Sequence, residues 1–162
     1  MFRIKLLIFL PISFLIISCV QNHEKQNSLN YDIDYIGGEY DGVNLKNILF
    51  NYLKSFKIYE DNSDLIIQSK ISHKNRLFVT NIDNTSDREE ISTSINFKVF
   101  DQKNNCPIYN EKYETSQFYV FASSEKFLSN KLAIKKIKTD NTETLIKKFI
   151  NKLFLLDRKC IE

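Results

Sequence analysis

Ile91-Ser92-Thr93-Ser94-Ile95-Asn96-Phe97-Lys98-Val99 is the most regular segment of the chain. Apolar residues and one threonine occupy its odd positions, whereas serine, asparagine and lysine occupy its even positions. Because successive side chains of a strand point to opposite faces of a sheet, this alternation predicts a strand with one buried and one polar face.

The segments on either side have the same character. In each of them the apolar residues lie an even number of positions apart, so they share one face of a strand. These residues are Leu65, Ile67, Ile71, Leu77 and Val79 before the central strand and Tyr109, Tyr113 and Tyr119 after it. We therefore predict strands at about 64–80 and 107–120, joined to the central one by polar turns at 81–87 and 101–105. Three successive strands with short turns indicate an antiparallel meander.

A short strand and a helix precede the meander. Tyr31, Ile33 and Tyr35 alternate with aspartates, which predicts a strand. The three glycines of the chain fall within six residues, at 37, 38 and 42, and indicate a turn with Asp41 as the helix N-cap. The following apolar residues have helical spacing and form one stripe: Leu45, Ile48, Leu49, Tyr52, Leu53 and Phe56.

The C-terminal segment, about 124–156, is expected to be helical. Phe127, Leu128, Leu132 and Ile134 form a first apolar face, and a stronger second face contains Leu145, Ile146, Phe149, Ile150, Leu153 and Leu156. Between them, Asp140 and Glu143 have the spacing of a capping box. This spacing favours a break in the helix at 139–143, and the alternative is a polar turn within one long helix.

The element order β-α-β-β-β-α predicts an α+β fold for a single domain spanning residues 31–162. The predicted architecture is a two-layer sandwich, with two helices packed on one face of a mainly antiparallel four-stranded sheet. The other face, rich in serine, asparagine, lysine and threonine, would meet water or a partner.

Composition excludes several classes of protein. With only three glycines and two prolines in 162 residues, the chain lacks phosphate-binding glycine loops and the nucleophile elbow. Without Arg3 and Lys5 of the leader described below, 21 basic side chains would face 20 acidic ones. No basic stripe interleaved with aromatics is present, so no nucleic-acid partner is expected.

Catalytic and metal-binding motifs are also missing from the sequence. The chain has two histidines, His23 and His73, and neither belongs to a metal-ligand motif. His73 falls on a predicted strand, where a histidine is more often a surface residue than a general base. We therefore expect no enzyme activity, no cofactor and no metal.

The first 18 residues have the organisation of an export signal. Arg3 and Lys5 precede an apolar run from Leu6 to Ile17, which is too short to span a bilayer as a helix. The run ends in Ile16-Ile17-Ser18-Cys19, which resembles the cleavage site of bacterial lipoproteins. Residues 1–18 are thus interpreted as a lipoprotein signal peptide. The alternatives are an ordinary secretory signal with a chance cysteine and an uncleaved anchor.

Cys19 would then become the lipidated N-terminus of the mature protein. Acyl chains such as palmitate contribute ~0.8 kcal/mol per buried CH₂ and would hold the protein on the lipid bilayer. Val20, in place of aspartate, resembles the sorting pattern of outer-membrane lipoproteins. Residues 19–30 are expected to form the lipidated end and a polar tether on the periplasmic side.

Two other cysteines, Cys106 and Cys160, lie in the domain. An exported protein meets an oxidising compartment, where the two can form a disulfide. Their spacing alone does not decide between a disulfide and two free thiols.

Together these features resemble the family of LPS-assembly lipoproteins called LptE, in a divergent, alphaproteobacterial-like form. The resemblance rests on order and spacing, and the segments that carry it are Ile16–Cys19, Val43–Leu49, Ser116–Tyr119, Phe127 with Leu132-Ala133, and Leu145–Leu153. It implies a lipoprotein that plugs the outer-membrane barrel LptD, helps it fold and helps to deliver lipopolysaccharide to the cell surface.

Three basic residues near the strand turns, Lys74, Arg76 and Arg88, are candidate contacts for lipid A phosphates. Ordinary solvated charges are the other interpretation. Two other function classes stay open: an envelope lipoprotein that activates or scaffolds a cell-wall synthase, and a lipid-anchored hydrolase whose site is not visible in the sequence.

The anchor can be tested directly. Replacing Cys19 with alanine removes the thiol that carries the acyl chains, so we expect the protein to leave the membrane fraction. Fractionation of the envelope with an antibody to a C-terminal tag measures the change. An unchanged membrane fraction would contradict lipidation at this residue.

Overall fold

The computed structural model describes residues 29–79, 86–120 and 127–161. The leader, Cys19 and most of the expected tether lie outside these ranges. The elements are β1 (Asp32–Gly37), α2 (Glu39–Ser55), β2 (Leu65–Val79), β3 (Ser86–Asp101), β4 (Cys106–Val120) and α3 (Phe127–Leu153). The predicted order β-α-β-β-β-α is confirmed.

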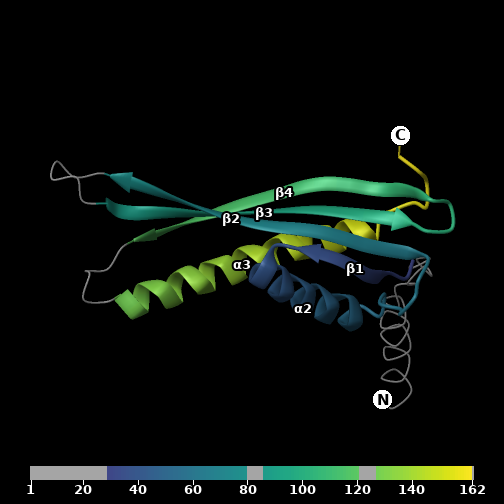
Figure 1. The fold of residues 1–162 in the computed structure, drawn as a ribbon, viewed down its shortest axis with the longest axis horizontal. Coiled ribbons are helices and arrows are strands. Elements are labelled where there is room, and N and C mark those ends of the chain that lie inside the picture. The colour runs from purple at the N-terminus through teal and green to yellow at the C-terminus, as the bar shows by residue number, and fades with distance from the viewer. Residues whose placement is uncertain (1–28, 80–85, 121–126, 162) are drawn as a thin grey trace, which may run out of the picture.

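The four strands form one sheet in the order β1-β2-β3-β4. β1 runs parallel to β2, and the pairs β2–β3 and β3–β4 are antiparallel, as the meander predicts. Both helices lie on the same side of the sheet, so the molecule has two layers (Figure 1). The α+β sandwich predicted from the sequence is therefore confirmed.

The helix-facing side of β3 is the centre of the core. Its alternate residues, which are the odd positions of the opening segment, have no solvent exposure: Ile91, Thr93, Ile95, Phe97 and Val99. Phe97 stacks on Phe149 of α3, with ring centroids 4.0 Å apart and the planes 5° from parallel. α2 adds Leu45, Leu49 and Leu53, each with 0% exposure. This face of β3 thus joins the sheet to the helix layer.

The long sheet has two different ends. At the end that we call proximal, β1 and α2 add to the sheet and to the helix layer, and the β3–β4 turn lies there with the C-terminal end of α3 (Figure 1). At the distal end α3 alone covers the sheet. Leu77 of β2 lies on the helix-facing side there and is 60% exposed, because β1 pairs only with the first residues of β2, up to Lys70.

The expected break in the C-terminal helix is wrong, because α3 is continuous through 139–143. Hydroxyl groups in this stretch donate to carbonyl oxygens one turn earlier, as in Thr142 to Lys138 at 2.8 Å and Thr144 to Asp140 at 2.8 Å. Asn141 is buried and donates to the Ile91 carbonyl at 3.0 Å. Polar residues here continue the helix and contact the sheet.

The first apolar face assigned to this helix is also wrong. Leu128 and Leu132 are 68% and 59% exposed, whereas Asn130 is buried. Asn130 accepts a hydrogen bond from the Tyr119 hydroxyl of β4. The N-terminal half of α3 therefore buries Asn130 in place of Leu128 and Leu132, and only its C-terminal half has the predicted apolar face.

Two local predictions near the first strand fail as well. Tyr35 is 64% exposed, because an irregularity in the β1–β2 register between Ile33 and Ile36 shifts the alternation. α2 begins at Glu39 after Gly38, which has φ 120° and no side-chain cap. A Cβ at Gly38 would lie 2.6 Å from Ile71, so glycine is required there and Asp41 falls within the first turn.

The predicted turn at 81–87 lies mostly outside the described residues, and its last two residues, Ser86 and Asp87, belong to β3. The other predicted turn, at 101–105, is present between β3 and β4.

The stack between β3 and α3 gives a stability prediction. Phe149→Ala leaves a cavity against Phe97 and should lower the free energy of unfolding by about 3–5 kcal/mol. Leu132→Ala, on the same helix but exposed, should change it by less than about 0.5 kcal/mol. Urea denaturation of both variants measures the difference, and equal effects would contradict this description of the core.

Candidate interaction surface

We call the sheet face that points away from both helices the open face. Its side chains come from the strand positions that alternate with the buried ones. Across β2, β3 and β4 the charged side chains at these positions are six basic and two acidic: Lys70, Lys74, Arg76, Arg88, Lys98 and Lys112 against Glu90 and Glu114. A chain with a formal net charge of only +3 thus places a marked positive excess on one face.

A hollow of about 90 Å³ lies in the middle of the open face. It is lined by three serines and three charged side chains: Ser72, Ser92, Ser94, Lys74, Lys112 and Glu114. Serine side chains are short, so they leave room that the longer lysines border. Hydroxyl and ammonium groups donate hydrogen bonds to anions, whereas the Glu114 carboxylate lies 3.3 Å from the Lys112 ammonium and offsets its charge. Lys74 and the three serines are therefore the part of the lining that suits a phosphate-sized group.

Apolar side chains adjoin this basic region toward the distal end. Phe78 and Phe118 make an edge-to-face contact with centroids 5.6 Å apart, and the Arg76 guanidinium lies 5.4 Å from the Phe78 ring. Phe118 and Val120 are 61% and 68% exposed. The distal open face therefore offers cations and exposed apolar surface side by side, a combination that suits an anionic amphiphile.

The structure brings the three predicted phosphate contacts, Lys74, Arg76 and Arg88, onto this one face. In the register of β2 with β3, Lys74 lies opposite Ser92, Arg76 opposite Glu90, and Phe78 opposite Arg88. The three basic residues therefore occupy successive rows of the sheet. Cys19, the predicted lipidation site, lies outside the described residues.

The proximal end holds the other predicted residues. Cys106 and Cys160 form a disulfide, with their Cα atoms 5.7 Å apart. Beyond it, the Ile161 N–H donates to the Pro107 carbonyl at 2.9 Å. These bonds attach the segment that follows α3 to the start of β4.

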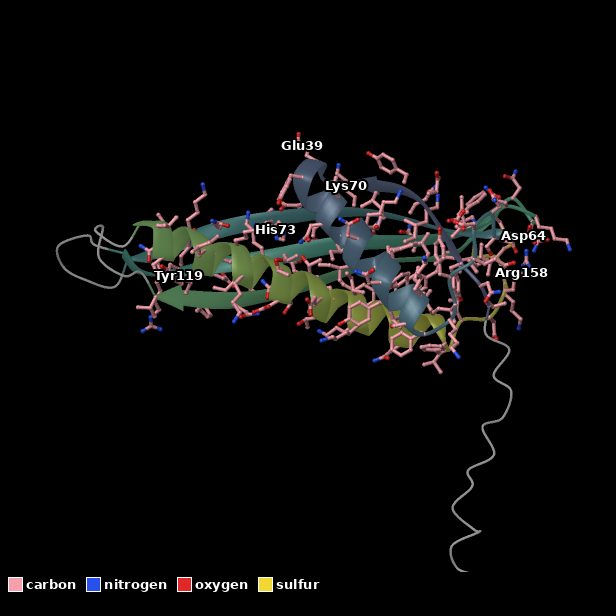
Figure 2. All side chains as sticks on the ribbon, turned by 90° about the horizontal axis from the view of Figure 1, so that it is seen from below. Glu39, Asp64, Lys70, His73, Tyr119 and Arg158 are labelled. Carbon is pink, nitrogen blue, oxygen red and sulfur yellow. A yellow bond between two sulfur atoms is a disulfide. The ribbon has the colours of Figure 1, made fainter. Side chains whose placement is uncertain are left out.

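Arg158 strengthens this attachment, and nothing in the sequence singled it out. Its guanidinium donates to both carboxylate oxygens of Asp101, which has 0% exposure, and to Asp64 at 3.2 Å (Figure 2). Together with hydrogen bonds from Asn104, Arg158 holds the pKa of Asp101 well below its usual range. A polar hollow of about 400 Å³ lies beside Arg158, where Asn30 enters the domain.

The His73 side chain is enclosed, contrary to the surface position expected for it. This side chain is 5% exposed and lies on the helix-facing side of the sheet, between the two helices (Figure 2). Nδ1 lies 2.8 Å from Thr93 Oγ1, and Nε2 lies 3.7 Å from the Asp41 carboxylate. This order matches a hydroxyl–histidine–carboxylate triad, but Thr93 has 0% exposure, so the hydroxyl is closed to any substrate.

Burial lowers the pKa of His73, Asp41 opposes this effect, and Lys138 of α3 adds to it. His73 is therefore a neutral polar contact between the sheet and the helix layer at neutral pH. Elsewhere in the described ranges, no three His, Cys, Asp or Glu side chains are grouped as metal ligands. None of the helices in those ranges is both long and apolar enough to span a membrane.

Sequence reasoning found three of the six basic residues of the open face, Lys74, Arg76 and Arg88, and missed its apolar ones. The sequence does contain a signal for them: Phe78 and Phe118 occupy positions that alternate with the buried residues of their own strands, so both must point to the open face. The serine-lined hollow requires the register of three strands, which the sequence alone does not provide.

Solved structures with a similar fold include several bacterial lipoproteins. A minor lipoprotein from Acinetobacter baumannii aligns over 79% of this chain and 92% of its own, with 10% identity and a TM-score of 0.57. Rare lipoprotein B from Shewanella oneidensis aligns over 76% and 94%, with 11% identity and a TM-score of 0.54. A lipoprotein B from Nitrosomonas europaea aligns over 75% and 79%, with 12% identity and a TM-score of 0.56.

No protein-family model matches the chain, and no curated protein matches it. The similarity at 10–12% identity therefore establishes a shared fold.

The burial of His73 predicts a pH dependence of stability. Because its pKa is lowered in the folded state, the unfolded chain binds the proton first as the pH falls below about 6.5. The free energy of unfolding should therefore fall between pH 7.5 and 5.5, by at most about 1.4 kcal/mol from this group. Urea denaturation at the two pH values measures the fall.

His73→Gln should remove that fall, whatever its effect on absolute stability. His23→Gln is the matched control, since His23 lies in the expected tether, and it should leave the fall unchanged. A pH dependence that survives in the His73 variant would assign it to other groups.

Proposed function

We propose that this protein is an outer-membrane lipoprotein, anchored through acylated Cys19, that binds an LptD-like β-barrel as its plug and assists the transport of lipopolysaccharide to the cell surface. The observation that carries the proposal is the open face, where a positive excess, a serine-lined hollow and exposed apolar side chains lie together. The shared fold of bacterial lipoproteins supports it.

Lipopolysaccharide combines the two chemistries of this face. Its lipid A part carries phosphates and acyl chains. Arginine forms paired hydrogen bonds with phosphate oxygens, and Arg76 and Arg88 lie in neighbouring rows near Lys74. Phe118 and Val120 supply exposed apolar surface at the same end. A ligand with charge alone would leave these two side chains in water.

The position of the tether agrees with this arrangement. The chain enters the domain at the proximal end, where Asn30 donates to Glu60 at 2.6 Å and accepts from Ser63 at 2.7 Å. The basic and apolar rows lie toward the opposite end of the sheet. A domain held at its proximal end can therefore reach into a partner with its distal end.

A binding role, without catalysis, is also compatible with a β-barrel partner. The lumen of an outer-membrane barrel is polar, and the open face offers serine, lysine and arginine to such a wall. We propose no catalytic residue, since the His73 arrangement is enclosed in the core.

Capture from envelopes tests the proposal. A C-terminally tagged protein, purified from detergent-solubilised envelopes, should recover a large β-barrel of the LptD kind together with lipopolysaccharide. Mass spectrometry identifies the barrel, and an assay for lipid A phosphate measures the glycolipid. Recovery of a penicillin-binding protein alone would favour the cell-wall synthase alternative, and recovery of neither would refute the proposal.

Variants assign the glycolipid to the open face. Replacing Lys74, Arg76 and Arg88 together with alanine should reduce the recovered lipid A phosphate at least about tenfold, since each charged hydrogen bond contributes about 1.5–3 kcal/mol. Replacing Lys131, Lys135 and Lys136 together with alanine is the matched control. These residues are exposed on α3, so this variant loses the same charge from the helix layer. Equal losses would indicate a general charge effect.

A further inference from the structure

The outer edge of β4 is a second surface, and two of its exposed residues, Lys112 and Glu114, also line the hollow of the open face. β4 is the last strand of the sheet, and within the described residues it has a strand neighbour on one side only. From the strand geometry and the charges along it, we propose that β4 pairs antiparallel with β4 of a second copy of this chain, which extends the sheet across two molecules.

The edge is long and regular enough for such pairing. The β3–β4 register has its one irregularity near Val99, so from Tyr109 to Val120 the pairing is unbroken. The chain has one proline in this strand, Pro107, at the proximal end, where Ile161 already bonds its carbonyl. Proteins commonly protect open edges with prolines or bulges, and this strand has neither along its distal two thirds.

The charge pattern selects one register. In an antiparallel pair centred on Tyr113, this tyrosine faces its own copy, and Lys112 of each chain faces Glu114 of the other. Both side chains are well exposed, at 63% and 57%, and lie 3.3 Å apart within one strand. Pairing would therefore form a group of four alternating charges on the open face, which favours association.

Neighbouring registers lose this complementarity. In a symmetric antiparallel pair, one residue faces its own copy, and this central residue defines the register. Residues that face each other must lie on the same side of the sheet, so the neighbouring registers are those whose central residue is one position earlier or later. A centre at Lys112 places the two lysines against each other, and a centre at Glu114 does the same with the two glutamates. Like charges directly opposite are unfavourable, so among these three registers the charges favour the pair centred on Tyr113.

The other pairs of this register are compatible with it. Asn110 would face Ser116 on the open face, and Glu111 would face Thr115 on the helix side. All four are polar and able to hydrogen-bond across the strands. The occupant that the edge fits is thus a second copy of the same strand, since its own sequence supplies each complementary residue.

Charge exchange tests this pairing in the full acylated protein purified in detergent. Sedimentation equilibrium should show a dimer of the native protein. Lys112→Glu and Glu114→Lys should each raise the dimer dissociation constant at least about tenfold, because each replaces two attractive pairs with repulsive ones. The double variant K112E/E114K restores opposite charges and should recover the dimer.

Lys46→Glu is the matched control, since it makes the same charge change at an exposed residue of α2, and it should leave the dissociation constant unchanged. A native protein that is monomeric throughout, or a double variant no better than the single ones, would overturn the inference. Since Lys112 and Glu114 are exposed, thermal unfolding of the variants should match the native protein at a protein concentration low enough to keep every form monomeric. Envelope capture of the barrel reports on the proposed function separately.

Discussion

The structure depends on the complete exclusion of water from one side of β3. Every alternate residue from Ile91 to Val99 is enclosed there, and a strand cannot enclose its own face. A long helix must therefore lie across it, and α3 does so with Phe149 stacked on Phe97. The rest of the core is arranged around this contact, because α2 packs beside α3 and β1 only widens the sheet at one end.

The spacing of apolar residues was sufficient to predict the sheet, from alternation, and α2, from helical periodicity. Together these elements were sufficient to predict the two-layer fold. Apolar spacing was insufficient wherever polar residues perform a structural task. Asn141 and the threonines of α3 resemble a helix break in sequence, yet Asn141 accepts a hydrogen bond from Gln117 and donates to the β3 backbone. His73 and Thr93 form another such contact. These partners are distant along the chain, so a local pattern contains no sign of them. Arg158 was missed for the same reason, since Asp101 lies 57 residues away.

The separation of the two sheet faces explains how a nearly neutral chain presents a charged surface. The core is formed by the helix-facing positions of the strands, so the alternate positions are not required for packing. Basic residues can therefore occupy the open face without disturbing the core. Phe78 and Phe118 belong to these alternate positions, where burial in the core cannot account for them. A face with cations, a serine-lined hollow and aromatic rings is the part of the domain best suited to a ligand, and it lies on the side that the helices leave uncovered.

The Cys106–Cys160 disulfide also has a consequence for the order in which the protein is made. Cys160 follows the last residue of α3, so all six elements precede it in the chain. In an exported chain that crosses the membrane from its N-terminus, Cys106 enters the oxidising compartment well before its partner. During that interval the lone thiol is open to other disulfides. If the chain is exported as proposed, closing the correct bond is therefore a late step, because the bond must wait until Cys160 has crossed the membrane.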